Sequence, residues 1–318
     1  MSIIEASIEL DHRSSLGEGP FYVSEMEKLL WIDINKHTLM LYDPKTKANK
    51  SFDLGEFVGF VVSSSSGGAV VGLTNGLAKI EFIKEGSEVV DILKTYIIDV
   101  ESHIPGTRFN DGKCDPNGLI WAGTMHIDEQ TKDAGSLYSF STDQGQISFK
   151  KQLSPVSISN GIVWNHKGDK MYYIDTPTLT ILEFDYQLDQ NIVSIHNKKV
   201  VFNVPPEWSA GPDGMCIDTD DKLWVAFYGN STVCRIDPIQ QKVLCTINVP
   251  GALNVTAAAF GGQDLRQLYI TTASQHMSEE ELKKHPNSGF LFKADLTQYF
   301  EEQEGDVRGA LFNTFNDK

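Results

Sequence analysis

The chain has 318 residues, of which 41% are hydrophobic, and its 27 basic and 43 acidic side chains give a formal charge of −16. Nucleic-acid binding draws its affinity mainly from Lys and Arg that neutralise phosphates, so this balance argues against a nucleic-acid partner. No Pro-, Ser- or Gly-rich linker divides the sequence, and we expect one domain over residues 1–318.

The N-terminus and the cysteines indicate a cytoplasmic protein. The first ten residues have no basic start and no uninterrupted apolar run, so we expect no signal peptide, and no run is long enough to span a membrane. Cys114, Cys216, Cys234 and Cys245 contain no CxxC pair, which favours buried free thiols. Cys234 and Cys245 fall on neighbouring expected strands, where they could face one another.

A short run of apolar and aromatic residues recurs six times along the chain. Its central positions are 31, 71, 121, 173, 224 and 269, separated by 40, 50, 52, 51 and 45 residues, a period typical of four-stranded propeller blades. Within the fourth unit, strand-like runs at 161–164, 171–175, 180–185 and 199–202 are bounded by turn residues. The pattern predicts an all-β chain that forms a six-bladed β-propeller with four antiparallel strands per blade. A pair of β-sandwiches fits the even spacing less well.

Helical periodicity is almost absent. Its one clear occurrence is residues 278–284, where Ser278 precedes an acidic first turn and can cap a helix. The ring of blades has to be closed near the chain ends. Residues 3–10 and 309–315 are both suited to the outer strand of the closing blade, and the sequence leaves the choice open.

Four polar motifs, at residues 15–20, 108–112, 159–161 and 212–214, each place an oxygen ligand beside a glycine and then open a strand. Such residues also make ordinary turns, but four of them share one register with the repeat. Because the innermost strand of a blade starts at the central channel, we expect their side chains to meet there. Carboxylate and amide oxygens suit Ca²⁺, Mg²⁺ or Mn²⁺ better than a structural zinc site. The side chains concerned are Glu18, Asn110, Asn160 and Asp213.

These motifs resemble the senescence marker protein, gluconolactonase and regucalcin family of six-bladed propellers, to which a luciferin-regenerating enzyme is also similar. The resemblance covers nearly the whole chain and is most specific at residues 108–115 and 121–125. It implies that Glu18, Asn160 and Asp213 bind one divalent metal ion in the central channel. Ca²⁺ is the favoured ion, and Zn²⁺, Mn²⁺ and Mg²⁺ are alternatives.

The resemblance also implies a set of substrate-binding residues. Arg108 and Asn110 match two of the family's positions, and Asp128 matches a glutamate in the loop after residues 123–125. Glu129 fills that role instead if the loop shifts by one residue. His276 lies near a strand end, where an exposed loop histidine is the simpler interpretation.

The implied activity is the metal-dependent hydrolysis of a sugar lactone such as gluconolactone. A bound metal ion polarises the ester carbonyl and acidifies water, and Asp213 is placed to act as the general base. The guanidinium fork of Arg108 suits ring or hydroxyl oxygens. The same site in a phosphotriester or luciferin-recycling hydrolase, or in a non-catalytic calcium-binding regulator, remains an alternative. We expect a small lactone as partner, no nucleic acid, no membrane, and a monomer or weak dimer.

Overall fold

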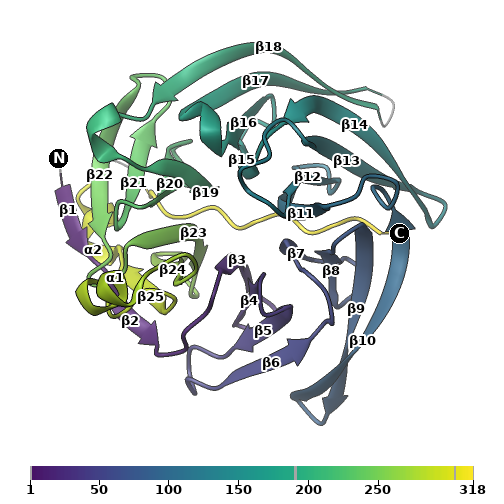
Figure 1. Ribbon diagram of the computed structural model, residues 1–318, viewed down its shortest axis with the longest axis horizontal. Helices are drawn as coiled ribbons and strands as arrows, with labels where there is room; N and C mark the ends of the chain where they lie inside the picture. The colour runs from purple at the N-terminus through teal and green to yellow at the C-terminus, as the bar shows by residue number, and fades with distance from the viewer. Residues whose placement is uncertain (1, 190–191, 304–305, 318) are drawn as a thin grey trace.

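The computed structural model describes residues 2–189, 192–303 and 306–317. Six β-sheets are arranged radially around a common axis, so the fold is the predicted six-bladed propeller (Figure 1). Each sheet has four strands that lie side by side, and each of these strands pairs antiparallel with its neighbours in the set.

The strands of the first three blades follow chain order from the axis to the rim (Figure 1). Blade one contains β3 (Gly17–Val23), β4 (Lys28–Asp33), β5 (Thr38–Tyr42) and β6 (Asn49–Asp53). Blade two contains β7 (Phe60–Ser63), β8 (Ala69–Gly72), β9 (Gly76–Glu85) and β10 (Glu88–Asp99). Blade three contains β11 (Thr107–Cys114), β12 (Ile120–His126), β13 (Gly135–Asp143) and β14 (Gln146–Val156).

The remaining blades repeat this order, with the N-terminal strands added at the rim. Blade four contains β15 (Ser159–Trp164), β16 (Lys170–Asp175), β17 (Thr180–Asp189) and β18 (Ile192–Asn203). Blade five contains β19 (Gly211–Ile217), β20 (Leu223–Tyr228), β21 (Thr232–Asp237) and β22 (Lys242–Asn248), with β1 (Ser2–Glu5) pairing parallel to β22 as a fifth strand. Blade six contains β23 (Asn254–Gly261), β24 (Gln267–Ala273), β25 (Leu291–Asp295) and β2 (Ser7–Leu10).

The six repeated apolar runs all form the second strand of their blade, namely β4, β8, β12, β16, β20 and β24. These strands are buried on both faces because each sheet packs against the blade on either side. Trp31, Trp121 and Trp224 at the centres of three of the runs have no exposed surface. The hydrophobic repeat read from the sequence is therefore the repeating inter-blade core.

The N-terminal segment closes the ring, and the C-terminal run 309–315 does not form the strand for which it was suited. β2 pairs antiparallel with β25 and is the outer strand of blade six. Residues 306–317, here called the C-terminal strap, instead cross the axis (Figure 1). The backbone N–H of Ala310 donates to the carbonyl of Ile217 in blade five, and that of Phe315 donates to the carbonyl of Ser63 in blade two.

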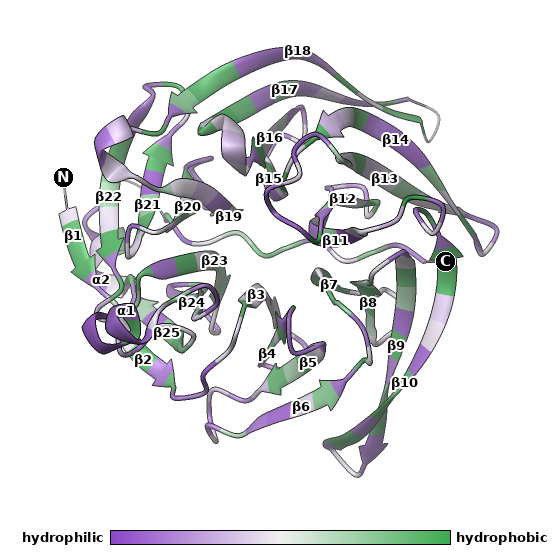
Figure 2. Cartoon of the chain, in the orientation of Figure 1, coloured by the Kyte–Doolittle hydropathy of each residue, from purple (hydrophilic) through white to green (hydrophobic). Residues whose placement is uncertain are grey.

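The predicted helix is confirmed as α1 (Glu279–Lys284), with a capping box between Ser278 and Glu281. It has no buried residue, and Figure 2 shows it as hydrophilic. The sequence did not indicate α2 (Thr297–Glu301), whose Tyr299 and Phe300 are buried, or the 3₁₀ turns at Thr176–Thr178 and Pro206–Trp208. Among the described residues, no helix has the length and apolar character needed to cross a membrane.

All four cysteines are buried and free, as expected. The suggestion that Cys234 faces Cys245 is wrong. Cys234 lies opposite Thr246 on the neighbouring strand, and Cys245 lies opposite Arg235. Since successive side chains of a strand point to opposite faces of the sheet, the two thiols lie on different faces.

Candidate metal and substrate site

One cavity of about 210 Å³ brings together side chains from the first strands of four blades. Five of the six residues predicted for the site line it. They lie toward the N-terminal ends of β3, β11, β15 and β19, which are the innermost strands of their blades. The five are Glu18, Arg108, Asn110, Asn160 and Asp213.

A break in strand register lies at or directly after four of these positions, and Arg108 keeps its partner Met125. On β11, Phe109 pairs with Thr124 and Asp111 with Gly123, so Asn110 has no partner across the ladder. Similar shifts occur on β3, β15 and β19. A β-bulge turns a side chain away from the regular alternation, which is how bulges commonly serve active sites. The glycines in the motifs allow this crowding, since a Cβ on Gly161 would lie 2.6 Å from the carbonyl oxygen of Asp213.

Glu18 and Asp213 are two buried carboxylates that repel one another. Burial, and next the charge of Asp111, raises the pKa of Glu18 to about 8. Burial also raises the pKa of Asp213 well above its usual value, followed by the charges of Glu18 and Asp111. Oδ1 of Asp213 is buried and has no hydrogen-bond partner among the described residues. A cation bound between the two carboxylates reduces their repulsion and gives Oδ1 of Asp213 a partner.

The formal charge of the side chains that line this cavity indicates the charge of the cation that would balance it. Three carboxylates and one guanidinium line the cavity, which gives a formal charge of −2 when all are ionised. One divalent cation would balance that charge. The carboxylates belong to Glu18, Glu129 and Asp213, and the guanidinium to Arg108.

Asn160 supplies the third oxygen of a possible ligand set. Its Nδ2 donates to Oγ1 of Thr176 over 2.9 Å, which leaves Oδ1 available to a cation. No group of three or more His, Cys, Asp or Glu side chains within the described residues could hold a metal ion. A set of two carboxylates and one amide has only two such side chains, and its oxygens would suit a hard divalent ion.

Arg108 and Asn110 form a buried pair on one side of the cavity. Nη1 of Arg108 donates to Oδ1 of Asn110 over 2.7 Å, and Nδ2 of Asn110 donates to the carbonyl of Ser159 over 2.9 Å. The amide oxygen of Asn110 is thus already engaged, which suits a role beside the metal better than a ligand role. Burial lowers the pKa of Arg108 to about 10, against the opposite effects of Glu129 and Glu18, so the guanidinium stays charged at neutral pH.

The loop between β12 and β13 places Glu129, and not Asp128, at the cavity. Asp128 is exposed, and its Oδ1 accepts a hydrogen bond from the backbone of Gln130. Of the two residues that the sequence left open, Glu129 therefore lines the cavity and Asp128 does not, so we propose the substrate-binding role for Glu129. Oε1 of Glu129 lies 3.5 Å from Nε2 of His276, which comes from the loop after β24.

Sequence reasoning missed three polar residues that line the cavity: Thr176, Tyr228 and Gln275. Tyr228 ends β20, and the other two follow β16 and β24. Because first and second strands are antiparallel, the end of a second strand lies beside the start of a first strand. The positions that follow the six apolar runs are therefore a sequence signal from which these cavity residues could have been predicted.

Comparison with known proteins places the chain in a family. The model of the SMP-30/Gluconolactonase/LRE-like region matches residues 16–274, and the chain belongs to this family. It is 39% identical over 294 residues to the putative sugar lactone lactonase YvrE of Bacillus subtilis (strain 168), covering 92% of this chain and 95% of the relative. It is 34% identical over 299 residues to regucalcin of Homo sapiens, with the same coverage of 92% and 95%.

Solved structures agree with this family. A luciferin-regenerating enzyme superposes with a TM-score of 0.84 at 29% identity, covering 98% of this chain and 99% of that one. A calcium-binding regucalcin from Agrobacterium tumefaciens also has a TM-score of 0.84, at 22% identity, and supports the fold.

Proposed function

We propose that this protein is a divalent-metal-dependent hydrolase that opens sugar lactones of the gluconolactone type. The observation that carries the proposal is the single cavity in which buried Glu18 and Asp213 face the Arg108–Asn110 pair. Two mutually repelling carboxylates provide a place for a cation, and the adjacent donors provide a place for a polar, uncharged substrate. Similarity to a putative sugar lactone lactonase supports this class of reaction.

The metal ligands in this proposal are Glu18, Asn160 and Asp213. When bound, a divalent ion supplies Lewis acidity toward the ester carbonyl and lowers the pKa of bound water. The ion favoured by the oxygen-only ligand set is Ca²⁺. The amide hydrogen bond from Asn160 to Thr176 fixes the orientation of the ligand oxygen before any ion arrives.

The protein's own side chains then bind the substrate and accept the proton. The carboxylate of Asp213, whose Oδ1 has no partner within the described residues, takes the proton from the attacking water. The guanidinium of Arg108 donates to ring or hydroxyl oxygens of the lactone. Glu129 accepts a hydrogen bond from a substrate hydroxyl at the cavity mouth. The product is a hydroxy acid.

The Arg108–Asn110 pair also favours an enzyme over a calcium-binding regulator. A cation site gains nothing from a buried guanidinium nearby, because like charges repel. Arg108 is only 3% exposed, and burying a charged group is costly unless it has hydrogen-bond partners. A substrate with several oxygens supplies such partners.

The test is hydrolysis of glucono-δ-lactone by protein stripped with a chelator, with Ca²⁺, Mg²⁺, Mn²⁺ and Zn²⁺ restored singly. We expect turnover to depend on the ion and to vanish in Asp213→Ala, while the surface variant Asp91→Ala keeps wild-type activity. Ion binding without turnover on this lactone or a panel of other sugar lactones would contradict the proposal.

A further inference from the structure

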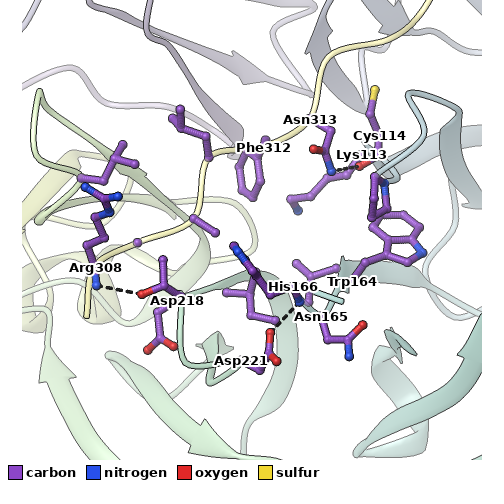
Figure 3. A pocket seen from close by; sticks show the side chains of 18 residues that line it. Lys113, Cys114, Trp164, Asn165, His166, Asp218, Asp221, Arg308, Phe312 and Asn313 are labelled. Atoms are coloured by element: carbon purple, nitrogen blue, oxygen red, sulfur yellow. Dashed lines mark hydrogen bonds between the residues drawn. The ribbon is translucent and has the colours of Figure 1, made fainter. Parts of the chain in front are cut away.

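A second cavity, of about 470 Å³, lies at the opposite end of the same inner strands. It shares no lining residue with the candidate active site. β11 contributes Arg108 and Asn110 to the first cavity and Lys113 and Cys114 to the second. The C-terminal strap forms one wall of this second cavity, through residues 308–313 (Figure 3).

Lys113 is the central feature of this cavity because its side chain is largely buried and its ammonium group makes no hydrogen bond among the described residues. The residue is 8% exposed. Its Nζ lies 3.8 Å from Oδ2 of Asp111 and 4.9 Å from the centre of the Phe312 ring. The first distance exceeds the roughly 2.7–3.2 Å of an N–H···O hydrogen bond. The ion pair with Asp111 therefore leaves N–H donors of Lys113 that a ligand in the cavity can use.

The two carboxylates that line this cavity are engaged elsewhere, so Asp111 is the one acidic side chain paired with Lys113 among the described residues. Asp218 lies in the wall, but Arg235 donates to its Oδ2 over 2.7 Å and Trp224 donates to the same oxygen over 2.9 Å. Its Oδ1 accepts two backbone hydrogen bonds. Asp221 accepts from the backbone of His166. Neither carboxylate is paired with Lys113 in the described residues.

Basic and apolar side chains make up much of the remaining wall. His166 and Arg308 also line the cavity, Arg308 at the far side from Lys113, and Figure 3 shows Lys113, His166 and Phe312 directed toward the same space. Apolar surface comes from the side chains of Val163, Trp164, Ile217, Leu265 and Phe312. A space of this size falls within the range of roughly 300–1,000 Å³ usual for small-molecule sites.

We propose that this cavity binds a small organic monoanion: one carboxylate on an apolar, preferably aromatic, body. The carboxylate accepts hydrogen bonds from Nζ of Lys113, and the apolar body packs against Phe312 and the side of Trp164. A single charge fits best because Lys113 already shares its charge with Asp111, 3.8 Å away, and Asp218 and Asp221 would repel a second negative charge. This site is separate from the proposed lactonase activity.

The experiment is calorimetric titration of the Ca²⁺-loaded, full-length protein with phenylacetate and with phenylacetamide, its uncharged counterpart. We expect phenylacetate to bind at least about tenfold more tightly than phenylacetamide. Lys113→Met should remove that preference, and Lys113→Arg should retain most of it. Lys284→Met, on the exposed helix α1, is the matched control and should behave as wild type.

Two further variants assign the binding to this cavity. Arg108→Gln should still bind phenylacetate, which separates the cavity from the active site. Leu311→Trp should weaken binding at least about tenfold by filling the cavity, and Leu311 is exposed enough to tolerate the change. It also serves if Lys113→Met does not fold. No binding by the wild type, equal binding of acid and amide, or loss of binding in Arg108→Gln would overturn the proposal.

Discussion

Arg108 and Asn110 lie two positions apart on β11 and are joined by a hydrogen bond of 2.7 Å from Nη1 to Oδ1. The bulge at Asn110 makes this contact possible, because it removes Asn110 from the ladder that pairs its neighbours with β12. The contact fixes which way the amide points. It therefore links a local irregularity of one strand to the chemistry of the cavity.

Arg108→Lys should lower kcat/KM for gluconolactone by about tenfold to a hundredfold. Lysine keeps the charge but loses the planar fork that reaches Asn110 and a substrate oxygen together, and a hydrogen bond to a charged group contributes about 1.5–3 kcal/mol. Steady-state kinetics with the Ca²⁺-loaded variant measures the effect. Arg266→Lys, near the surface, is the control. Activity within twofold of the wild type would show that Arg108 does not contact substrate.

Asp213→Asn should abolish turnover and yet stabilise the metal-free protein. The substitution keeps the shape of the side chain and removes one of two buried, mutually repelling carboxylates. We expect the melting temperature without metal to rise by about 2–4 °C, the shift typical for about 1 kcal/mol in a protein of this size or slightly smaller. Differential scanning calorimetry with and without Ca²⁺ tests this. The wild type should gain more stability from Ca²⁺ than the variant.

Glu129→Gln should raise KM for the lactone by about three- to tenfold with a smaller effect on kcat, because Gln keeps an acceptor but a hydrogen bond to a charged group is about 1 kcal/mol stronger than a neutral one. Asp128→Asn is the matched comparison and should change KM by less than twofold. The two variants differ by one position in the same loop. If the larger effect falls on Asp128, the loop adopts a different register when substrate is present.

Asp317→Asn should destabilise the protein at pH 7 by about 1–2 kcal/mol. Burial alone would raise the pKa of Asp317, but hydrogen bonds from Ser66, Ser64, Ser65 and Lys79 outweigh it and hold the pKa well below its usual value. Because the folded-state pKa is depressed, this stabilisation is present above the unfolded value of about 3.9 and is lost as the pH falls toward the folded value. Urea unfolding at pH 7 and pH 3 measures it. An equal loss at both pH values would contradict the charge-based explanation.

Much of the fold followed from the sequence because the same packing requirement recurs in every blade. Trp31, Trp121 and Trp224 occupy equivalent buried places, so their spacing reports the architecture directly. Residues 309–315 could not be placed in the same way. Their composition suits a strand, but the outer position of blade six is taken by β2, and only the folded ring shows that.

The candidate site, like the fold, could be predicted only where its residues follow the repeat. Glu18, Asn110, Asn160 and Asp213 begin strands whose register the repeat determines, so a one-dimensional pattern was enough to group them. The position of Glu129 depends on how a loop folds back over the cavity, which local sequence does not determine. Gln275 reaches the cavity from a loop in which its side chain accepts from Asn35, a contact across 240 positions of the chain.

The closure of the ring by β2 has a consequence for biosynthesis. β2 pairs with β25, which lies about 280 residues later, so its partner does not yet exist while most of the chain is being made. At roughly 5–20 residues per second, the ribosome delivers that partner only after tens of seconds. Throughout that time β2 is an unpaired strand, the kind of edge on which chains associate wrongly. The first two strands of the nascent protein therefore lack their native partners, β22 for β1 and β25 for β2, until late in synthesis.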